Sequence, residues 1–222
     1  MIVLVCLESP APGRASRAAI DLACTLAGGA QVMAISAGGP ASSASLALAR
    51  AHASVARVLH LDEPALDKAD FLTVGMVLAE AARHLQADLI IAGERSDDEG
   101  QGLVPAALAH HLKVPLISRV QAVRLSATAE TVEVTTRAGG QLCTLACPLP
   151  LVLSTTPSRA SAAEPAMANR GVVETLTLAQ LGVDGSRLVP RPDLLGALVP
   201  AAAACARDMT FAQAAENLLR HR

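Results

Sequence analysis

Short apolar runs alternate with segments of helical periodicity along the first half of the chain. Runs such as 2–7 and 87–92 lack polar alternation, which is typical of strands buried on both faces. Glycine and proline mark the ends of the segments between them. This rhythm predicts right-handed βαβ units and therefore an α/β fold with an open, mostly parallel sheet and helices on both faces. The predicted strands cover 2–7, 31–36, 56–61 and 87–92, and the predicted helices cover 14–26, 42–52, 67–85 and 105–112.

The pattern changes after Pro115. Three strand-like runs, 116–125, 131–137 and 141–147, are separated by short turns. In the middle run, apolar and polar residues alternate, as expected for a half-exposed antiparallel strand. These runs predict antiparallel strands added at one edge of the sheet. A further buried strand at 149–155 would complete an α/β nucleotide-binding domain that spans residues 1–156.

The remaining residues, 157–222, show little periodicity of their own. Residues 157–171 are rich in Ala, Ser and Pro, which indicates a linker. A short helix is expected at 174–181 and a terminal helix from Thr210. Because this region has so little core, we expect an extended C-terminal arm that packs on a partner subunit.

Composition and charge exclude several classes of protein. The longest uncharged apolar stretch, 194–206, contains Pro200 and is shorter than the roughly 20 residues that a spanning helix needs, so an integral membrane protein is not expected. The formal net charge is −2, and Phe71 and Phe211 are the only aromatic residues. Nucleic-acid binders need a basic surface and stacking platforms, so nucleic acid is not an expected partner. No signal peptide is recognisable, which favours a cytoplasmic protein.

Reactive side chains offer little evidence of catalysis. Five cysteines without a secretory signal argue against a disulfide framework. Cys143 and Cys147 are expected to be small buried residues, and the adjacent His110 and His111 point in different directions on a helix, so no metal site is predicted. The motifs GxSxG, HExxH, GxGxxG and the P-loop are missing. We therefore do not expect an enzyme that acts through its own side chains.

Loops at the carboxyl ends of the parallel strands are the candidate ligand sites, because ligands of open α/β sheets bind there. These loops are 6–13, 36–40 and 93–102. In the third loop, Gly100 and Gly102 permit close approach of a ligand, Ser96 and Gln101 can donate to phosphate, and Arg95 supplies charge. The same loop can equally be an acidic turn that caps a helix through Asp97 or Asp98.

Four segments resemble the electron-transfer flavoprotein β-subunit family. They are 87–93 with the acidic loop and Pro105 after it, 32–38 with its Ser-x-Gly sequence, 55–59, and 174–183 with its Leu-Ala-Gln-Leu-Gly sequence. Their order and spacing match the family over most of residues 1–184.

This resemblance implies an adenine-nucleotide-hydrolase-like fold and a binding partner, the larger α subunit. The heterodimer would carry electrons from flavin dehydrogenases to a downstream acceptor, with FAD held mainly by the α subunit. The β subunit of this family holds AMP, or a second FAD in bifurcating members. Matched by position, the base falls on Cys6, Ala37 and Gly38, and the phosphate falls on 93–102. The candidate cofactor-binding residues are Cys6, Ser36, Ala37, Gly38, Gly93, Arg95, Ser96, Asp97, Gly100, Gln101 and Gly102.

The chain departs from the family pattern in three loops. The loop before the first helix is shorter than the family's Asn-Pro-Phe loop, and 100–102 matches its Asn-Gln-Thr only in part. Residues 157–171 contain only Arg159 and Arg170 where the family has a basic run. Four carboxylates surround Arg95 in 94–99, a poor setting for a diphosphate, so we expect AMP at most in this subunit.

Two other functions compete with this interpretation. One is an adenine-nucleotide-binding regulatory module of the stress-protein type, which the antiparallel strands and the long C-terminal region disfavour. The other is a nucleotide-dependent transferase, which the missing catalytic motifs disfavour. Flavin bound to a complex with an α subunit would distinguish the first interpretation from both.

Overall fold

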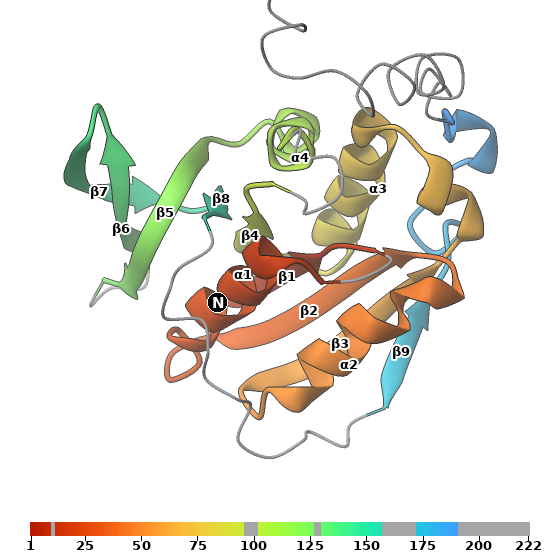
Figure 1. Cartoon of the computed structure of the whole chain (residues 1–222), viewed down its shortest axis with the longest axis horizontal. Coiled ribbons are helices and arrows are strands. Elements are labelled where there is room, and N and C mark those ends of the chain that lie inside the picture. Colours follow the sequence, from red (N-terminus) through yellow and green to blue (C-terminus); the bar gives the residue numbers. More distant parts are fainter. Residues whose placement is uncertain (10–11, 96–101, 127–129, 157–171, 191–222) are drawn as a thin grey trace, which may run out of the picture. The chain divides into compact units, whose positions relative to one another are not determined.

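A nine-stranded sheet in the order β7-β6-β5-β8-β4-β1-β2-β3-β9 forms the centre of the molecule (Figure 1). The computed structural model describes residues 1–9, 12–95, 102–126, 130–156 and 172–190. The strands are β1 (Ile2–Leu7), β2 (Gln31–Gly38), β3 (Val55–Asp62), β4 (Leu89–Gly93), β5 (Leu116–Leu125), β6 (Thr131–Ala138), β7 (Gln141–Pro148), β8 (Leu151–Thr155) and β9 (Val173–Leu176). The helices are α1 (Arg14–Cys24), α2 (Ser43–Ala51), α3 (Phe71–His84) and α4 (Val104–Leu112), with short 3-10 turns η1 (Pro40–Ser42), η2 (Pro64–Lys68) and η3 (Gly185–Arg187).

Strand directions confirm the predicted α/β fold. β1 pairs in parallel with β2 and β4, and β3, β8 and β9 continue the parallel sheet. β6 is antiparallel to both β5 and β7. The antiparallel strands therefore lie at one edge of the sheet, as the polar alternation in β6 predicted.

Each face of the sheet carries its own apolar core. Val3 and Val5 of β1 pack with α1 and α2, whereas Leu4, between them in sequence, packs with α3 and α4. Successive side chains of a strand point to opposite faces, so an uninterrupted apolar run supplies both cores. This two-sided burial explains why β1, β2 and β4 lack polar alternation.

β5 changes partners halfway along its length. Its first half is parallel to β8, and its second half pairs only with β6. The ladders shift register around Arg119, whose φ is 56°. Val123 of β5 and Val134 of β6 are buried in the same core as Ile20 of α1. The antiparallel strands thus cover the flank of α1 instead of standing apart from the parallel sheet.

Two sequence predictions need correction. The helix expected at 174–181 is wrong, because residues 173–176 form β9, which pairs with β3 and is held by an ion pair of 2.6 Å between Arg57 and Glu174. The helix expected from residue 67 begins at Phe71, because the Asp70 carboxylate accepts a hydrogen bond from the Thr73 N–H and caps α3 there.

Through β9 the sheet extends beyond the boundary predicted at residue 156. Met1–Pro190 form one compact unit. The predicted terminal helix lies outside the described residues, and packing of 157–222 on a partner stays a prediction. Among the described residues, no helix is long and apolar enough to cross a membrane.

Candidate functional site

The order of the sheet reverses at β1, which lies between β4 and β2. The chain builds β2 and β3 on one side of β1 and then returns to place β4 on the other side. Open α/β sheets bind ligands at the carboxyl ends of the strands where this reversal occurs. The three loops singled out in the sequence follow β1, β2 and β4. The candidate site is the carboxyl ends of these three strands with the loops that follow them, which we call the crevice.

Small side chains line the strand ends of this crevice. Cys6 of β1 lies level with Ile35 of β2 and Ala92 of β4. Burial in the core that faces α3 and α4 raises the pKa of the Cys6 thiol to about 12, so the thiol stays neutral. Ala37 packs at the edge of the same core as Cys6. Neutral, small groups of this kind suit the face of a planar base.

Gly93, at the end of β4, lets α1 approach the sheet closely. A Cβ atom there would lie 2.9 Å from Cβ of Ala15 and 3.1 Å from the Ala15 carbonyl carbon. Any larger residue would push the first turn of α1 away from β4. The glycine is therefore required for packing whether or not a ligand binds beside it.

The Gly38 carbonyl and the Gly39 N–H, in the turn after β2, both form hydrogen bonds within the chain. The Gly38 carbonyl accepts from Nε2 of His60 at 3.0 Å and from the Glu63 N–H at 3.2 Å. Oδ1 of Asp67 accepts from the Gly39 N–H at 3.1 Å. Gly38 has a φ of 145°, and a Cβ there would lie 2.4 Å from Oδ1 of Asp67. A ligand that needs these backbone groups would have to displace Asp67.

Two serines extend the network from Asp67. The hydroxyl of Ser9, in the loop after β1, lies 2.9 Å from that of Ser42, in the turn after β2. Ser9 also donates to Oδ1 of Asp67 at 3.4 Å. Three loops from separate parts of the sequence are joined in this way. The sequence contains no local signal for this network.

The N-terminus of α1 already has a carboxylate partner. Oε2 of Glu8 accepts from the Gly13 N–H at 2.9 Å, where the helix has no other side-chain cap. The Glu8 N–H in turn donates to the Ser16 hydroxyl at 3.2 Å, and the Ser45 hydroxyl donates to the Glu8 carbonyl. A negative charge stabilises this helix end, so a phosphate would compete with Glu8 there.

The loop after β4 is described only at its two ends. Ser96, Asp97, Gly100 and Gln101 lie outside the described residues, whereas Arg95 and Gly102 lie inside them. Gly102 has a φ of 66°, and a Cβ there would lie 2.6 Å from the Glu94 carbonyl oxygen. The close approach at Gly102 is to the chain's own backbone, so this geometry explains the glycine without a ligand, and the choice of Gly102 as a cofactor-binding residue stays a prediction.

Glu94, in the loop after β4, and Ser36, on β2, differ in how their polar groups are paired. The Glu94 N–H donates to the Thr155 carbonyl at 2.9 Å, and the Glu94 carboxylate lies 4.0 Å from Nε of Arg119. Ser36 of β2 is fully buried, and its hydroxyl has no hydrogen-bond partner in the described structure. A buried hydroxyl without a partner is costly, so Ser36 is a residue to which a ligand can contribute a bond.

Residues suited to hold a metal ion are not clustered in the described ranges. An adenine nucleotide fits part of the crevice. The neutral groups at Cys6 and Ala37 suit its base, and Gly102, with its positive φ, forms a tight turn after β4. Among the described groups on the β1 and β2 side, the bonded turn at 38–39 and the Glu8 carboxylate disfavour phosphate, and the buried Ser36 hydroxyl is the side-chain group without a partner. The loop after β4 stays the predicted position of the phosphate.

Comparison with known sequences gives a consistent result. The family model for the electron transfer flavoprotein domain matches residues 3–181, from β1 to the turn after β9. Similar curated proteins include the electron transfer flavoprotein subunit beta of Mycobacterium bovis and of Mycobacterium tuberculosis, each 29% identical over 138 residues, or 60% of this chain and 51% of the relative. The Mycobacterium leprae protein of the same name is 29% identical over 134 residues, or 58% of this chain and 50% of the relative. The chain spans about half the length of these relatives.

Proposed function

Since the chain belongs to the electron transfer flavoprotein family, we propose that it is the β subunit of a heterodimer that passes electrons from flavin dehydrogenases to a downstream acceptor. One observation carries the proposal: the family match runs from β1 to beyond β9 and so includes all three loops of the crevice. The curated relatives are β subunits by name. Members of this family are electron carriers rather than enzymes.

We base the proposed positions of FAD and AMP in the heterodimer on the residues of the crevice. FAD, which supplies the redox chemistry, would be held mainly by an α subunit. In this chain, the base of AMP would lie against Cys6 and Ala37, and its phosphate would lie at the loop from Gly93 to Gly102. The neutral Cys6 thiol supports this arrangement. Cytoplasmic location stays a prediction.

Co-expression with a candidate α subunit tests this function. We expect a heterodimer by light scattering, with visible flavin absorbance, one FAD per heterodimer, and AMP released on denaturation. A flavin-to-heterodimer ratio near two would overturn the assignment of AMP to this subunit. A chain that forms no complex with any α subunit tested, and shows no flavin absorbance, would overturn the electron-transfer function itself.

A further inference from the structure

β5 contains a bulge where it passes the carboxyl ends of the parallel strands. Three steps along β5, from Ile117 to Val120, match two steps along β8, from Leu153 to Thr155. Arg119 lies inside this bulge with a φ of 56°, a conformation that is costly for a residue with a side chain. Bulges redirect side chains beside binding sites, so the direction of the Arg119 side chain is the feature to explain.

Two buried hydroxyl groups fix the backbone of the bulge. The Thr136 hydroxyl donates to the Ser118 carbonyl at 2.6 Å, and the Thr155 hydroxyl donates to the Val120 carbonyl at 2.9 Å. Both threonines are buried, where a hydroxyl group needs a hydrogen-bond partner. The chain therefore holds the backbone at Arg119 in place through its own groups, and the guanidinium takes no part in this.

The Arg119 side chain reaches the start of the loop after β4. Gly93, the last residue of β4, lies level with Thr155 of β8, and Nε of Arg119 lies 4.0 Å from the Glu94 carboxylate. The Arg119 side chain is 61% exposed. An exposed ion pair at this distance contributes little to stability, so the Arg119 guanidinium can exchange Glu94 for another anion at little cost.

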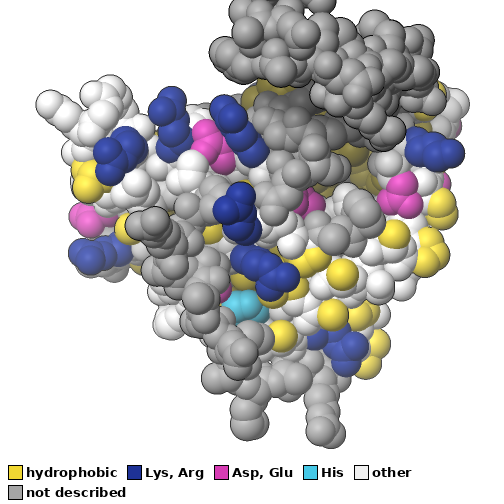
Figure 2. Space-filling view, viewed as in Figure 1, with side chains coloured by type: hydrophobic (Ala, Val, Ile, Leu, Met, Phe, Trp, Pro, Cys, Tyr) yellow, Lys and Arg dark blue, Asp and Glu magenta, His cyan; other side chains and the backbone are white. Residues whose placement is uncertain are grey.

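The loop after β4 has an excess of negative charge. Residues 94–99 contain four carboxylates and a single cation, Arg95. Carboxylates close to a phosphate repel it, so a phosphate at this loop needs a cation from another element. Lys and Arg side chains gather on the side of the molecule that holds β5–β7 and α1 (Figure 2). In the described structure, Arg119 is the arginine from this side that forms an ion pair with the loop.

We propose that Arg119 selects a phosphorylated ligand at the loop after β4, by exchanging the Glu94 carboxylate for the phosphate of AMP. A guanidinium presents paired N–H donors that match phosphate oxygens, and a phosphate monoester carries more negative charge than one carboxylate. The specificity residue thus comes from the bulge of β5 and not from the loop itself. The inference rests on the nucleotide site of the proposed function, but it does not depend on electron transfer.

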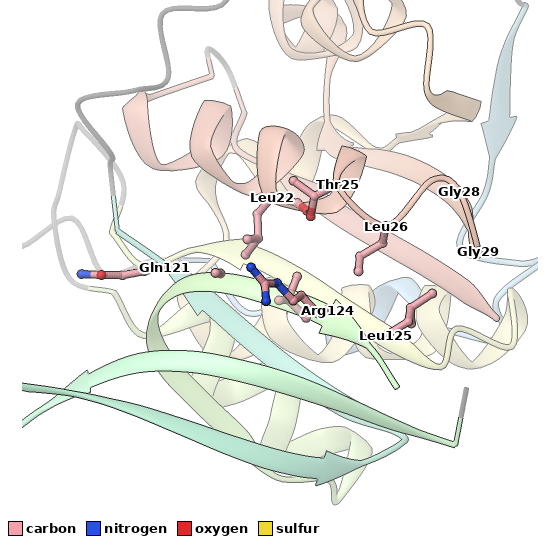
Figure 3. A pocket seen from close by; sticks show the side chains of 10 residues that line it. Leu22, Thr25, Leu26, Gly28, Gly29, Gln121, Arg124 and Leu125 are labelled. Carbon is pink, nitrogen blue, oxygen red and sulfur yellow. The ribbon is translucent and has the colours of Figure 1, made fainter. Parts of the chain in front are cut away.

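Arg124 of the same strand provides a matched control. It lines a cavity of about 530 Å³ between the end of α1 and the second half of β5, opposite Leu22 and Leu26 (Figure 3). This cavity adjoins the turn at 28–29, which precedes β2, and not the loops of the crevice. Arg124 is therefore an exposed arginine of β5 that lies away from the proposed phosphate position.

Binding of AMP and of adenosine to the full chain, measured by isothermal titration calorimetry, tests the proposal. Adenosine lacks the phosphate, so the difference between the two ligands isolates phosphate recognition. We expect Arg119→Gln to weaken AMP binding about tenfold, as for the loss of a hydrogen bond between charged groups, and to leave adenosine binding unchanged. Arg119→Lys, which keeps the charge, should retain part of the affinity for AMP. Arg124→Gln should change neither ligand.

Two further variants separate recognition from a structural role of the ion pair. Glu94→Gln removes the anion that competes for Arg119, so AMP binding should become about threefold tighter, within the range for an exposed pair. Arg119→Gly removes the guanidinium but suits a φ of 56°. It should therefore weaken AMP binding as much as Arg119→Gln does.

Four results would overturn the proposal. They are AMP binding by Arg119→Gly that equals that of the wild type, equal weakening by Glu94→Gln and Arg119→Gln, equal losses for AMP and adenosine in Arg119→Gln, and no binding of either ligand by the wild type. None of them bears on the electron-transfer function, which the flavin content of the heterodimer decides separately.

Discussion

The two sides of the crevice are built differently. On the β2 side, around residues 36–42 and 60–67, the Gly38 carbonyl and the Gly39 N–H both have partners within the chain. On the β4 side, around residues 93–95 and 102–104, α4 begins with no side-chain cap at Leu103. The first N–H groups of a helix have no partner within the helix, and among the described residues no side chain caps those of α4, whose Pro105 has no N–H to donate.

This difference assigns separate roles to two glycine-containing turns that look alike in the sequence. A ligand at the 38–39 turn would have to replace internal hydrogen bonds worth about 1 kcal/mol each. At the start of α4, the described residues form no side-chain cap that a ligand would have to replace. We therefore expect substitutions on the β2 side to reduce stability, and substitutions on the β4 side to reduce nucleotide binding.

The largest effect is expected from Gly38→Val. The variant combines a backbone conformation that disfavours side chains with a clash against Asp67. Strain of this kind and overpacking each cost about 1–3 kcal/mol, so we expect a loss of about 3 kcal/mol or more in the free energy of unfolding, measured with urea. Gly185→Val, at an open glycine, is the control. If Gly38→Val has the same free energy of unfolding as the wild type, the β2 side does not have the stabilising role assigned to it.

Gly102→Ala should act mainly on nucleotide content. The added Cβ would crowd the Glu94 carbonyl and deform the loop proposed to bind phosphate. We expect the AMP released from the purified complex, measured by mass spectrometry, to fall about tenfold, equivalent to about 1.4 kcal/mol. Gly139→Ala is the matched control, because Gly139 has a similar φ of 55° in an open turn. Equal loss of nucleotide in both variants would remove the special role of the β4 side.

The sequence predicted the strands and loops on both sides of the crevice. It did not predict the hydrogen-bond network that is found on the β2 side. The apolar runs located β1, β2 and β4, because strands buried on both faces carry a continuous apolar pattern. The same pattern placed three loops at the carboxyl ends of the parallel strands. Ser9, Ser42 and Asp67 come together only through the tertiary fold, and no spacing along the chain indicates that contact.

Short elements were the hardest to predict. β9 has four residues, too few to show a strand period, and the leucines at 176, 178 and 181 also fit the short helix expected at 174–181. Its position depends on pairing with β3, which lies more than a hundred residues earlier in the sequence.

A smaller effect is expected from Asp67→Ala on the β2 side. The variant leaves the Gly39 N–H without its acceptor and removes a bond to Ser9. We expect a loss of about 1 kcal/mol in the free energy of unfolding, with unchanged AMP content of the complex. Asp67→Asn, which keeps an acceptor oxygen, should lose less. If Asp67→Ala lowers the AMP content without lowering the free energy of unfolding, the ligand lies on the β2 side. The roles assigned to the β2 and β4 sides would then be exchanged.

The smallest effect concerns the ion pair between Arg57 of β3 and Glu174 of β9, at the edge of the sheet beyond β2. The hydrogen bond from Arg57 lowers the pKa of Glu174, and the same bond raises the pKa of Arg57. The Arg57 and Glu174 side chains are 35% and 44% exposed, and exposed pairs contribute about 0.2–1 kcal/mol. We expect Glu174→Gln to reduce the free energy of unfolding by about 0.5 kcal/mol at neutral pH.

The pH dependence of this difference identifies its source. A carboxyl group whose pKa is lowered by folding stabilises the protein above its unfolded pKa of about 4.3, and this stabilisation is lost as the pH falls through the lower folded value. The wild type and Glu174→Gln should therefore differ at neutral pH and converge in acid. Glu80→Gln, which removes the pair with Arg83 within α3, is the control for an ion pair away from the sheet edge. If Glu174→Gln remains less stable than the wild type by the same amount in acid, the charge on Glu174 does not contribute to the free energy of unfolding. The backbone pairing with β3 alone would then hold β9.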